Sequence, residues 1–374
     1  MSGERILVVD DEAGMLHGVE RILRSNYTVA TCSDPIQAIE LANEVDPELA
    51  ILDVRMPELD GFGLMRKLRE TRPAIDVIFM TGAVHEIDTQ LTRAIRERAF
   101  YFIQKPFDRD VLLALVDRCL ELRRLSRENA EHVARLEGEL TAARNFQRGL
   151  LPGEAASFGG VQLSARSRPC DDLGGDFYDW IEVSPGRVAL LVGDVSGHGV
   201  SAAMLTGIVK SAFHDAHTED FAPAAVAGRV ARALRPFDAG KFVTLFCARV
   251  DSDGALEYVN AGHPPPLIWG GEHDPRELKL TGPLVSPVLA DLEWGTASCE
   301  LNAGERLLVY TDGLTEARRG EDELWGEERL HAAATESAVD GEALLDEIFT
   351  RVNEFTGGAP PDDDETLLTL RVGS

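Results

Sequence analysis

Cysteine is scarce in this sequence, and its spacing is irregular. The five cysteines are Cys32, Cys119, Cys170, Cys247 and Cys299. Disulfide frameworks and thiolate zinc sites need paired cysteines, so neither is expected. No stretch approaches the roughly 20 apolar residues that cross a bilayer, and acidic residues directly follow the first apolar run, unlike in a signal peptide. We therefore expect a cytoplasmic protein without a membrane partner.

Basic residues are also few, because 37 Lys and Arg stand against 64 Asp and Glu, which gives a formal net charge of −27. A nucleic-acid-binding protein needs a basic face, and no helix-turn-helix pattern is present, so we expect no nucleic-acid partner. The acid excess is explained either by solubility or by carboxylates gathered around metal ions. A length of 374 residues is too great for one ordinary core and predicts two domains.

Residues 1–121 alternate short apolar runs with stretches of helical spacing. This pattern predicts an α/β domain in which a five-stranded parallel sheet is covered by helices on both faces. The expected strands are Ile6–Val9, Val29–Cys32, Leu49–Leu52, Val77–Met80 and Tyr101–Ile103.

Polar side chains follow four of these strands near their ends: Asp10 and Asp11, Asp53, Thr81 and Lys105. Ligands bind outside the carboxyl ends of an open parallel sheet, so we expect these five side chains to converge. Three carboxylates suit Mg²⁺. A carboxylate beside the cation can attack a phosphoryl group, while a hydroxyl and an ammonium stabilise the product.

With these residues, the segment resembles the receiver domain of two-component response regulators, which has a flavodoxin-like fold. The resemblance implies a histidine kinase as phosphodonor, Mg²⁺ as cofactor and Asp53 as phosphoacceptor. It assigns the metal ligands to Asp10, Asp11, Asp53 and the backbone carbonyl of Arg55. It assigns the switch positions to Thr81, Lys105 and Phe102, and it implies a cis peptide bond at Lys105–Pro106.

Residues 108–150 lack proline and strand signals and predict one long helix. Along residues 122–150 apolar positions recur at steps of three and four, and Asn129 fills the seam between Leu125 and Val133. The two successive steps of four form a stutter, which locally unwinds a coiled coil. Arg and Glu cover the other faces, so the narrow apolar stripe favours a parallel coiled coil and a homodimer. The alternative is a single helix lying on a domain surface.

Pro152 and Gly153 end the helical pattern, and residues 151–374 show runs of strands with helices grouped apart. This order predicts an α+β layered domain. The expected strands include Arg187–Val192, Val243–Val250, Leu256–Asn260, Arg306–Tyr310 and Thr366–Val372. Helices are expected near Ser201–Ala216, Ala222–Ala233 and Gly341–Phe355.

Four acidic motifs punctuate this domain: GGDFYDW with Asp176 and Asp179, GDVSGHG with Asp194, YTDGLTEA with Asp312, and DDDET with Asp363. Carboxylates without cysteine favour Mg²⁺ or Mn²⁺ over zinc, and two such ions can clamp a phosphoryl group for attack by water. Each motif alone is weak, since TDG is a common turn. We interpret GHPPP at 262–266 as a rigid turn, and His198 and His263 as loop or supporting residues rather than metal ligands.

Together and in this order, the motifs resemble the metal-dependent, PP2C-like protein phosphatases of the bacterial sporulation and stress-response branch, over about residues 145–374. The resemblance implies a β-sandwich flanked by helices, two Mn²⁺ or Mg²⁺ ions, and a phosphoserine or phosphothreonine substrate. It assigns the catalytic and metal positions to Asp176, Asp194, the backbone carbonyl of Val195, Asp312 and Asp363. Thr366 fixes the register that selects Asp363 over Asp364.

Two features depart from the eukaryotic members of that family. By the same resemblance, Asp194 bridges the two metal ions. Ser196 stands two residues later, where the eukaryotic members carry a histidine, so the acid for the leaving group is unassigned. Their phosphate-binding arginine has no evident counterpart either. Arg166 and Arg168 lie upstream of Asp176, and the sequence gives no ground for choosing between them.

The sequence therefore predicts a response regulator whose receiver controls a protein phosphatase. By resemblance, the substrate is an anti-anti-sigma-type phosphoprotein in partner-switching signalling. One alternative is a module that binds a phosphoprotein without turnover. Another is a receiver that serves as a docking domain and never takes a phosphoryl group.

Overall fold

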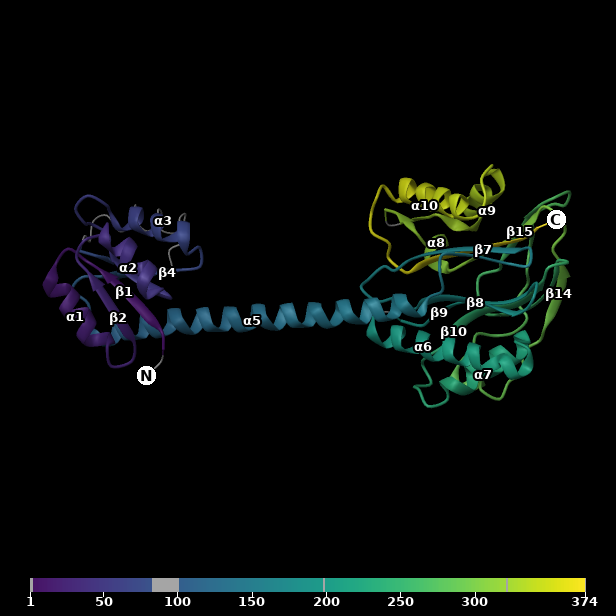
Figure 1. The fold of residues 1–374 in the computed structure, drawn as a ribbon, viewed down its shortest axis with the longest axis horizontal. Helices are drawn as coiled ribbons and strands as arrows, with labels where there is room; N and C mark the ends of the chain where they lie inside the picture. The colour runs from purple at the N-terminus through teal and green to yellow at the C-terminus, as the bar shows by residue number, and fades with distance from the viewer. Residues whose placement is uncertain (1–2, 83–100, 198, 321, 374) are drawn as a thin grey trace. The chain divides into compact units, whose positions relative to one another are not determined.

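The computed structural model describes residues 3–82, 101–197, 199–320 and 322–373. The chain forms two compact units, Met1–Arg135 and Leu136–Ser374, and the division between them falls inside helix α5 (Arg109–Leu150) (Figure 1). The predicted domain limits at residues 121 and 150 remain predictions. None of the helices among the described residues is both long enough and apolar enough to cross a membrane.

Five parallel strands form the sheet of the first unit, in the order β2-β1-β3-β4-β5. They are β1 (Arg5–Val9), β2 (Thr28–Cys32), β3 (Leu49–Asp53), β4 (Asp76–Thr81) and β5 (Tyr101–Gln104). The helices packed on it are α1 (Ala13–Leu23), α2 (Gln37–Val45), α3 (Gly61–Thr71) and the first turns of α5. Buried apolar clusters lie on both faces of the sheet, which confirms the predicted flavodoxin-like fold.

Helix α5 is a single helix of 42 residues, as the sequence predicts. Its first turns bury Leu112 and Val116 against the receiver sheet. Farther along, the seam residues Leu125, Val133 and Leu136 are 48%, 46% and 59% exposed. An apolar stripe left in solvent is typical of a surface that binds a partner. The coiled coil remains a prediction, and this exposure supports it.

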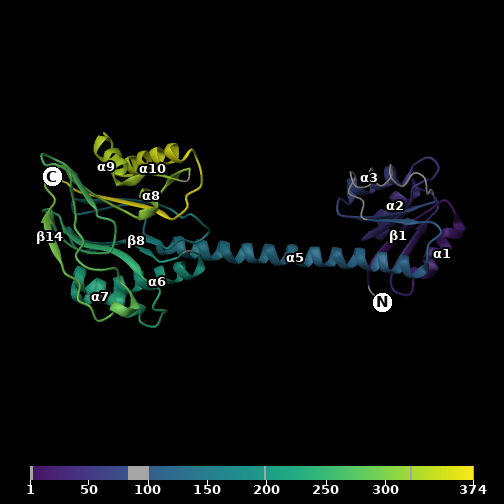
Figure 2. The ribbon, with the colours of Figure 1, turned by 180° about the vertical axis from the view of Figure 1, so that it is seen from behind.

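Two antiparallel sheets face each other in the second unit, with helices on their outer sides (Figures 1 and 2). One sheet has the order β14-β11-β10-β9-β8, and the other β13-β12-β15-β18-β7-β6. An apolar core fills the space between the sheets. Helices α6 (Val200–Asp215) and α7 (Pro223–Leu234) cover the first sheet, and α9 (Gly326–Glu336) and α10 (Glu342–Thr356) cover the second. The predicted β-sandwich flanked by helices is confirmed.

The two sheets of the sandwich have five and six strands among the described residues. The strands of the first sheet are β8 (Asp176–Ser184), β9 (Arg187–Val195), β10 (Val243–Asp251), β11 (Ala255–Ala261) and β14 (Ala297–Glu300). Those of the second are β6 (Ala155–Phe158), β7 (Val161–Arg168), β12 (Leu267–Gly270), β13 (Arg276–Glu277), β15 (Glu305–Tyr310) and β18 (Glu365–Val372). The short elements α8 (Asp312–Thr315), β16 (Arg318–Arg319) and β17 (Glu323–Leu324) follow β15. The sequence did not predict α9, because alanines form most of its buried face.

If the exposed seam of α5 joins two chains, a charge placed on it will separate them. We expect Val133→Asp to convert a dimeric wild type into a monomer without lowering the Tm of either domain, because Val133 contacts no domain core. Light scattering behind a sizing column measures the mass. His132→Asp, at the neighbouring exposed position, is the matched control and stays dimeric. A wild type that is monomeric at micromolar concentration contradicts the coiled coil.

Candidate functional site

Lys105 links two of the predicted acids at the carboxyl edge of the receiver sheet. Its Nζ lies 2.6 Å from Asp10 Oδ2 and 2.6 Å from Asp53 Oδ1. Both carboxylates are buried, and burial raises the pKa of Asp53 although the hydrogen bond from Lys105 opposes that shift. The second oxygen of Asp53 accepts a hydrogen bond from the backbone amide of Arg55 at 2.9 Å. The structure therefore brings Asp10, Asp53 and Lys105 together, as predicted.

The remaining receiver residues lie around this ion-pair network. Thr81 is buried at the end of β4, whereas Asp11 is exposed. Phe102 lies on β5, with its ring centroid 5.3 Å from that of Phe79. The peptide bond between Lys105 and Pro106 is cis, which confirms that prediction.

The acidic motifs of the second unit lie at or next to the ends of strands. Asp176 begins β8 and stands directly opposite Asp194, near the end of β9. Asp312 begins α8 immediately after β15, and β18 begins two residues after Asp363. Since β15 and β18 are hydrogen-bonded neighbours, the last two acids meet at one end of the second sheet. The four acids predicted from the motifs therefore lie at the same end of the sandwich.

These carboxylates repel one another. Burial, together with the charges of Asp312, Asp363 and Asp364, raises the pKa of Asp194 to about 7. Burial and the charge of Asp194 also raise the pKa of Asp176, and burial raises that of Asp312. Like charges held together in a partly buried site favour protonation or the binding of a cation.

Asp364 is engaged by backbone amides of the loop before β8, whereas its neighbour Asp363 accepts from the amide of Asp364 itself at 2.8 Å. The Asp364 carboxylate accepts hydrogen bonds from the amides of Cys170 (2.8 Å) and Gly175 (2.5 Å), and a longer one from Asp176 (3.3 Å). It thereby fastens the loop that leads into β8. Asp363 is exposed, and its charge acts on Asp194. This arrangement favours the predicted choice of Asp363 as the metal-facing residue, which remains a prediction.

Glycine is required where this loop meets the end of β9. A Cβ at Gly175 would lie 2.6 Å from the carbonyl oxygen of Val195 and 3.1 Å from Asp194 Oδ1. The Gly175 carbonyl in turn accepts a hydrogen bond from the Val195 amide at 3.2 Å. The glycine pair in GGD therefore permits the backbone to approach Asp194.

A chain of hydroxyls orients Asp176, and sequence reasoning did not identify it. Thr311 Oγ1 donates to Asp176 Oδ2 at 2.7 Å and accepts from the amide of Thr366 at 2.9 Å. The hydroxyl of Thr366 donates to Ser167 Oγ at 2.9 Å. Thr311 immediately precedes Asp312, so the T of the TDG motif was the available signal.

The donor set fits the predicted hard cations. Within the described part of the chain, no three Asp, Glu, His or Cys side chains are arranged as a preformed metal cluster. Yet the carboxylates that raise one another's pKa offer only oxygen donors, which Mg²⁺ and Mn²⁺ prefer. A divalent cation would offset this repulsion. The individual metal ligands in both units remain predictions.

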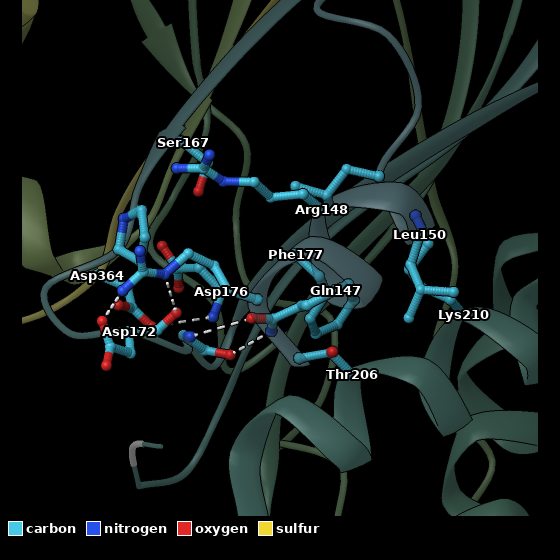
Figure 3. A pocket seen from close by; sticks show the side chains of 14 residues that line it. Gln147, Arg148, Leu150, Ser167, Asp172, Asp176, Phe177, Thr206, Lys210 and Asp364 are labelled. Carbon is cyan, nitrogen blue, oxygen red and sulfur yellow. Dashed lines mark hydrogen bonds and ion pairs between the residues drawn. The ribbon is translucent and has the colours of Figure 1, made fainter. Parts of the chain in front are cut away.

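The C-terminal end of α5 contacts the same loop (Figure 3). The side-chain amide of Gln147 makes two hydrogen bonds with the backbone of Gly174, donating to its carbonyl at 2.6 Å and accepting from its amide at 3.3 Å. Arg144 forms an ion pair with Asp172 and donates to the Asp172 carbonyl at 3.3 Å. The QRGLLP segment thus has a defined contact that spacing alone did not reveal.

Both arginines upstream of Asp176, Arg166 and Arg168, form ion pairs with acidic residues. Arg166 pairs with Glu154 and Asp346, each at 3.0 Å, and Arg168 pairs with Glu365 at 2.8 Å. The structure therefore assigns both arginines to ion pairs within the domain.

The other polar residues of the motifs have structural partners. Asp179 accepts from Lys210 (2.8 Å) and contacts His214 (2.9 Å), which joins β8 to α6. His263 is buried, and its Nδ1 lies 3.0 Å from the hydroxyl of Thr244, which stands opposite Asp194 on β10. Burial lowers the pKa of His263 to about 3, so its ring is neutral. His198 lies outside the described residues.

Comparison with known families agrees with this geometry. Residues 184–373 match the family model of stage II sporulation protein E (SpoIIE), and residues 6–117 match the response regulator receiver domain. The fold and the site thus define a receiver domain fused to a PP2C-like phosphatase domain. The chain belongs to the SpoIIE family.

Individual relatives share each half of this architecture. Protein IcfG of Synechocystis sp. is 29% identical over 275 residues, which cover 66% of this chain and 43% of IcfG. Phosphoserine phosphatase RsbP of Bacillus subtilis is 30% identical over 182 residues, covering 47% of this chain and 45% of RsbP. The SiaA-PP2C domain of Pseudomonas aeruginosa has the same fold, with a TM-score of 0.56 and 23% identity over 65% of this chain and 99% of that one. The chain spans about half the length of the curated relatives it matches.

Repulsion at Asp194 makes the metal-free protein sensitive to pH. The folded-state pKa of about 7 exceeds the ordinary value near 3.9, so the folded protein binds more protons than the unfolded chain between these values. Stability is therefore lost as the pH rises through this window. We expect metal-free Asp194→Asn to have a higher Tm than metal-free wild type at about pH 8, by about 2–4 °C per kcal/mol of relieved repulsion.

Differential scanning calorimetry of the phosphatase transition, with and without Mg²⁺, measures this effect. At about pH 5 the difference between the two proteins shrinks, because wild-type Asp194 is then protonated. Mg²⁺ is expected to stabilise wild type far more than the variant. Equal stabilisation of both proteins by Mg²⁺ contradicts the assignment.

Proposed function

We propose that the second unit is a metal-dependent phosphatase that hydrolyses phosphoserine or phosphothreonine in another protein. The observation that carries this proposal is the convergence of Asp176, Asp194, Asp312 and Asp363 at one end of a SpoIIE-type sandwich. RsbP, which shares this domain, is named a phosphoserine phosphatase. The proposal goes beyond family membership, because it assigns an activity to this chain.

Each acidic residue has a distinct task in this proposal. Asp194 and the carbonyl of Val195 would hold one divalent ion, and Asp194, Asp312 and Asp363 would hold the second. The ions supply the Lewis acidity needed for water to attack phosphorus. Thr311 keeps Asp176 in a fixed orientation through its hydrogen bond, and Asp364 holds the loop that carries Asp176.

The first unit receives a phosphoryl group from a histidine kinase at Asp53. Mg²⁺ would be held there by Asp10, Asp11, Asp53 and the carbonyl of Arg55. The Lys105 ammonium already contacts Asp53, so it is placed to stabilise the charge on a phosphorylated side chain. Thr81 and Phe102 then move as the switch residues.

Helix α5 transmits the change between the units. The stutter around Asn129 offers two registers of a parallel homodimer, and a change of register would rotate the end of the helix. Gln147 and Arg144 connect that end to the loop Cys170–Gly175, which leads to Asp176. A rotation of α5 therefore moves the catalytic loop.

The substrate is an anti-anti-sigma-type phosphoprotein, and the chain acts in the cytoplasm in partner-switching signalling. This assignment rests on the relatives of the SpoIIE family and on the resemblance of the motifs. The proposed substrate group is a phosphoserine in an exposed segment of that protein.

Phosphate release from a phosphoserine anti-anti-sigma protein tests the activity. With Mn²⁺ or Mg²⁺ we expect turnover by wild type, its loss after chelation, and at least about a 100-fold lower kcat for Asp194→Asn. Asp362→Asn removes an exposed charge beside Asp363 and is the matched control, with unchanged kcat. Tight binding of the phosphoprotein without turnover by wild type would instead favour the non-catalytic binding module.

The ratio of kcat with and without a beryllofluoride mimic of phospho-Asp53 tests control by the receiver. We expect a ratio different from 1 in wild type and a ratio near 1 in Gln147→Ala, because both hydrogen bonds to Gly174 are lost. Asn145→Ala, an exposed neighbour on α5, keeps the wild-type ratio. A wild-type ratio of 1 refutes control by the receiver, and an unchanged ratio in Gln147→Ala refutes this route.

A further inference from the structure

A phosphate monoester approaching this site meets a strongly negative surface. The acids of the site carry like charges, and the whole chain has a formal net charge of −27. Phosphoryl oxygens are bound most effectively by an arginine, whose planar guanidinium donates two parallel hydrogen bonds. Arg166 and Arg168 are each paired with carboxylates of the domain, which makes an unpaired cation the better candidate.

A pocket of about 80 Å³ lies beside Asp176. The end of α5, the end of β7, the loop before β8 and the middle of α6 form its walls (Figure 3). Three cationic side chains line it, and two of them are paired: Arg144 with Asp172, and Lys210 with Asp179. The third, Arg148, has no acidic partner among the residues that the structure describes.

The backbone at Arg148 is held in place through the preceding residue, and the Arg148 side chain is exposed. Gln147, the preceding residue, is held to Gly174 by two hydrogen bonds, so the backbone of this turn is anchored to the catalytic loop. The Arg148 side chain extends across the pocket toward Ser167 (Figure 3). Ser167 belongs to the hydroxyl chain that continues through Thr366 and Thr311 to Asp176. The guanidinium therefore faces the same pocket as the catalytic acid.

We propose that Arg148 binds the phosphoryl group of the substrate, a phosphate monoester dianion, in this pocket. The inference rests on the proposed phosphatase function and names its substrate-binding cation. Because Arg148 belongs to α5, the helix that leaves the receiver also supplies the group that recognises phosphate. A displacement of α5 then changes substrate affinity as well as the position of the catalytic loop.

Lys241 is the competing candidate. Its Nζ donates to the backbone carbonyl of Ser196 at 3.4 Å, next to Val195. It does not line the pocket beside Asp176. We expect Lys241 to support the loop after β9, and its substitution to leave phosphate affinity unchanged.

Binding of inorganic phosphate in the presence of Mg²⁺, measured by calorimetry, tests Arg148 without requiring turnover. We expect Arg148→Ala to raise the Kd about tenfold, as loss of a charge-assisted hydrogen bond predicts, and Arg148→Lys to restore part of the affinity. Arg127→Gln, an exposed arginine elsewhere on α5, binds like wild type. With p-nitrophenyl phosphate, Arg148→Ala raises KM similarly and leaves kcat within about twofold.

An unchanged Kd in Arg148→Ala overturns the inference, as does a tenfold rise in Lys241→Ala alone. A fall in kcat with unchanged KM also overturns it, because it would indicate a disturbed loop rather than lost binding. Failure of wild type to hydrolyse any phosphate ester refutes the proposed function instead, and the binding experiment still decides the role of Arg148.

Discussion

Repulsion between carboxylates is the interaction on which both units of this protein depend. In the first unit, Asp10 and Asp53 lie close enough for one ammonium, that of Lys105, to contact both. In the second, burial together with the charges of Asp312, Asp363 and Asp364 raises the pKa of Asp194 to about 7. Such clusters are costly until a cation offsets their charge. The fold keeps the carboxylates close together despite their repulsion, because the ends of the strands fix where the acids lie.

The loop before β8 connects the acidic site to other elements of the second unit. Three groups form hydrogen bonds with this loop: the carboxylate of Asp364, directly before β18; the amide of Val195, at the end of β9; and the side chain of Gln147, on α5. Its conformation therefore depends on the strands that carry the acids and on helix α5. A displacement of this end of α5 would reach the site through Gly174, two positions from Asp176, without requiring a change in the sandwich itself.

Strong local patterns predicted most of the fold. Continuous apolar runs identified all five receiver strands, and the absence of proline identified α5. The acidic motifs identified residues whose convergence follows from strand order. What the sequence could not reveal were contacts between distant side chains, such as Thr311 with Asp176 or Gln147 with Gly174. Helix α9 was missed because alanine carries little periodic signal, and Arg166 and Arg168 could be assigned only through their acidic partners.

The central claim is that the carboxylates of the sandwich hold two divalent ions. Calorimetric titration of Mn²⁺ tests it most directly, in a chain carrying Asp11→Asn and Asp53→Asn so that the receiver site does not contribute. The account predicts two ions bound per chain, and loss of both when Asp194 is also replaced by Asn, because that carboxylate is shared. Binding that is absent, or that survives Asp194→Asn unchanged, would contradict it.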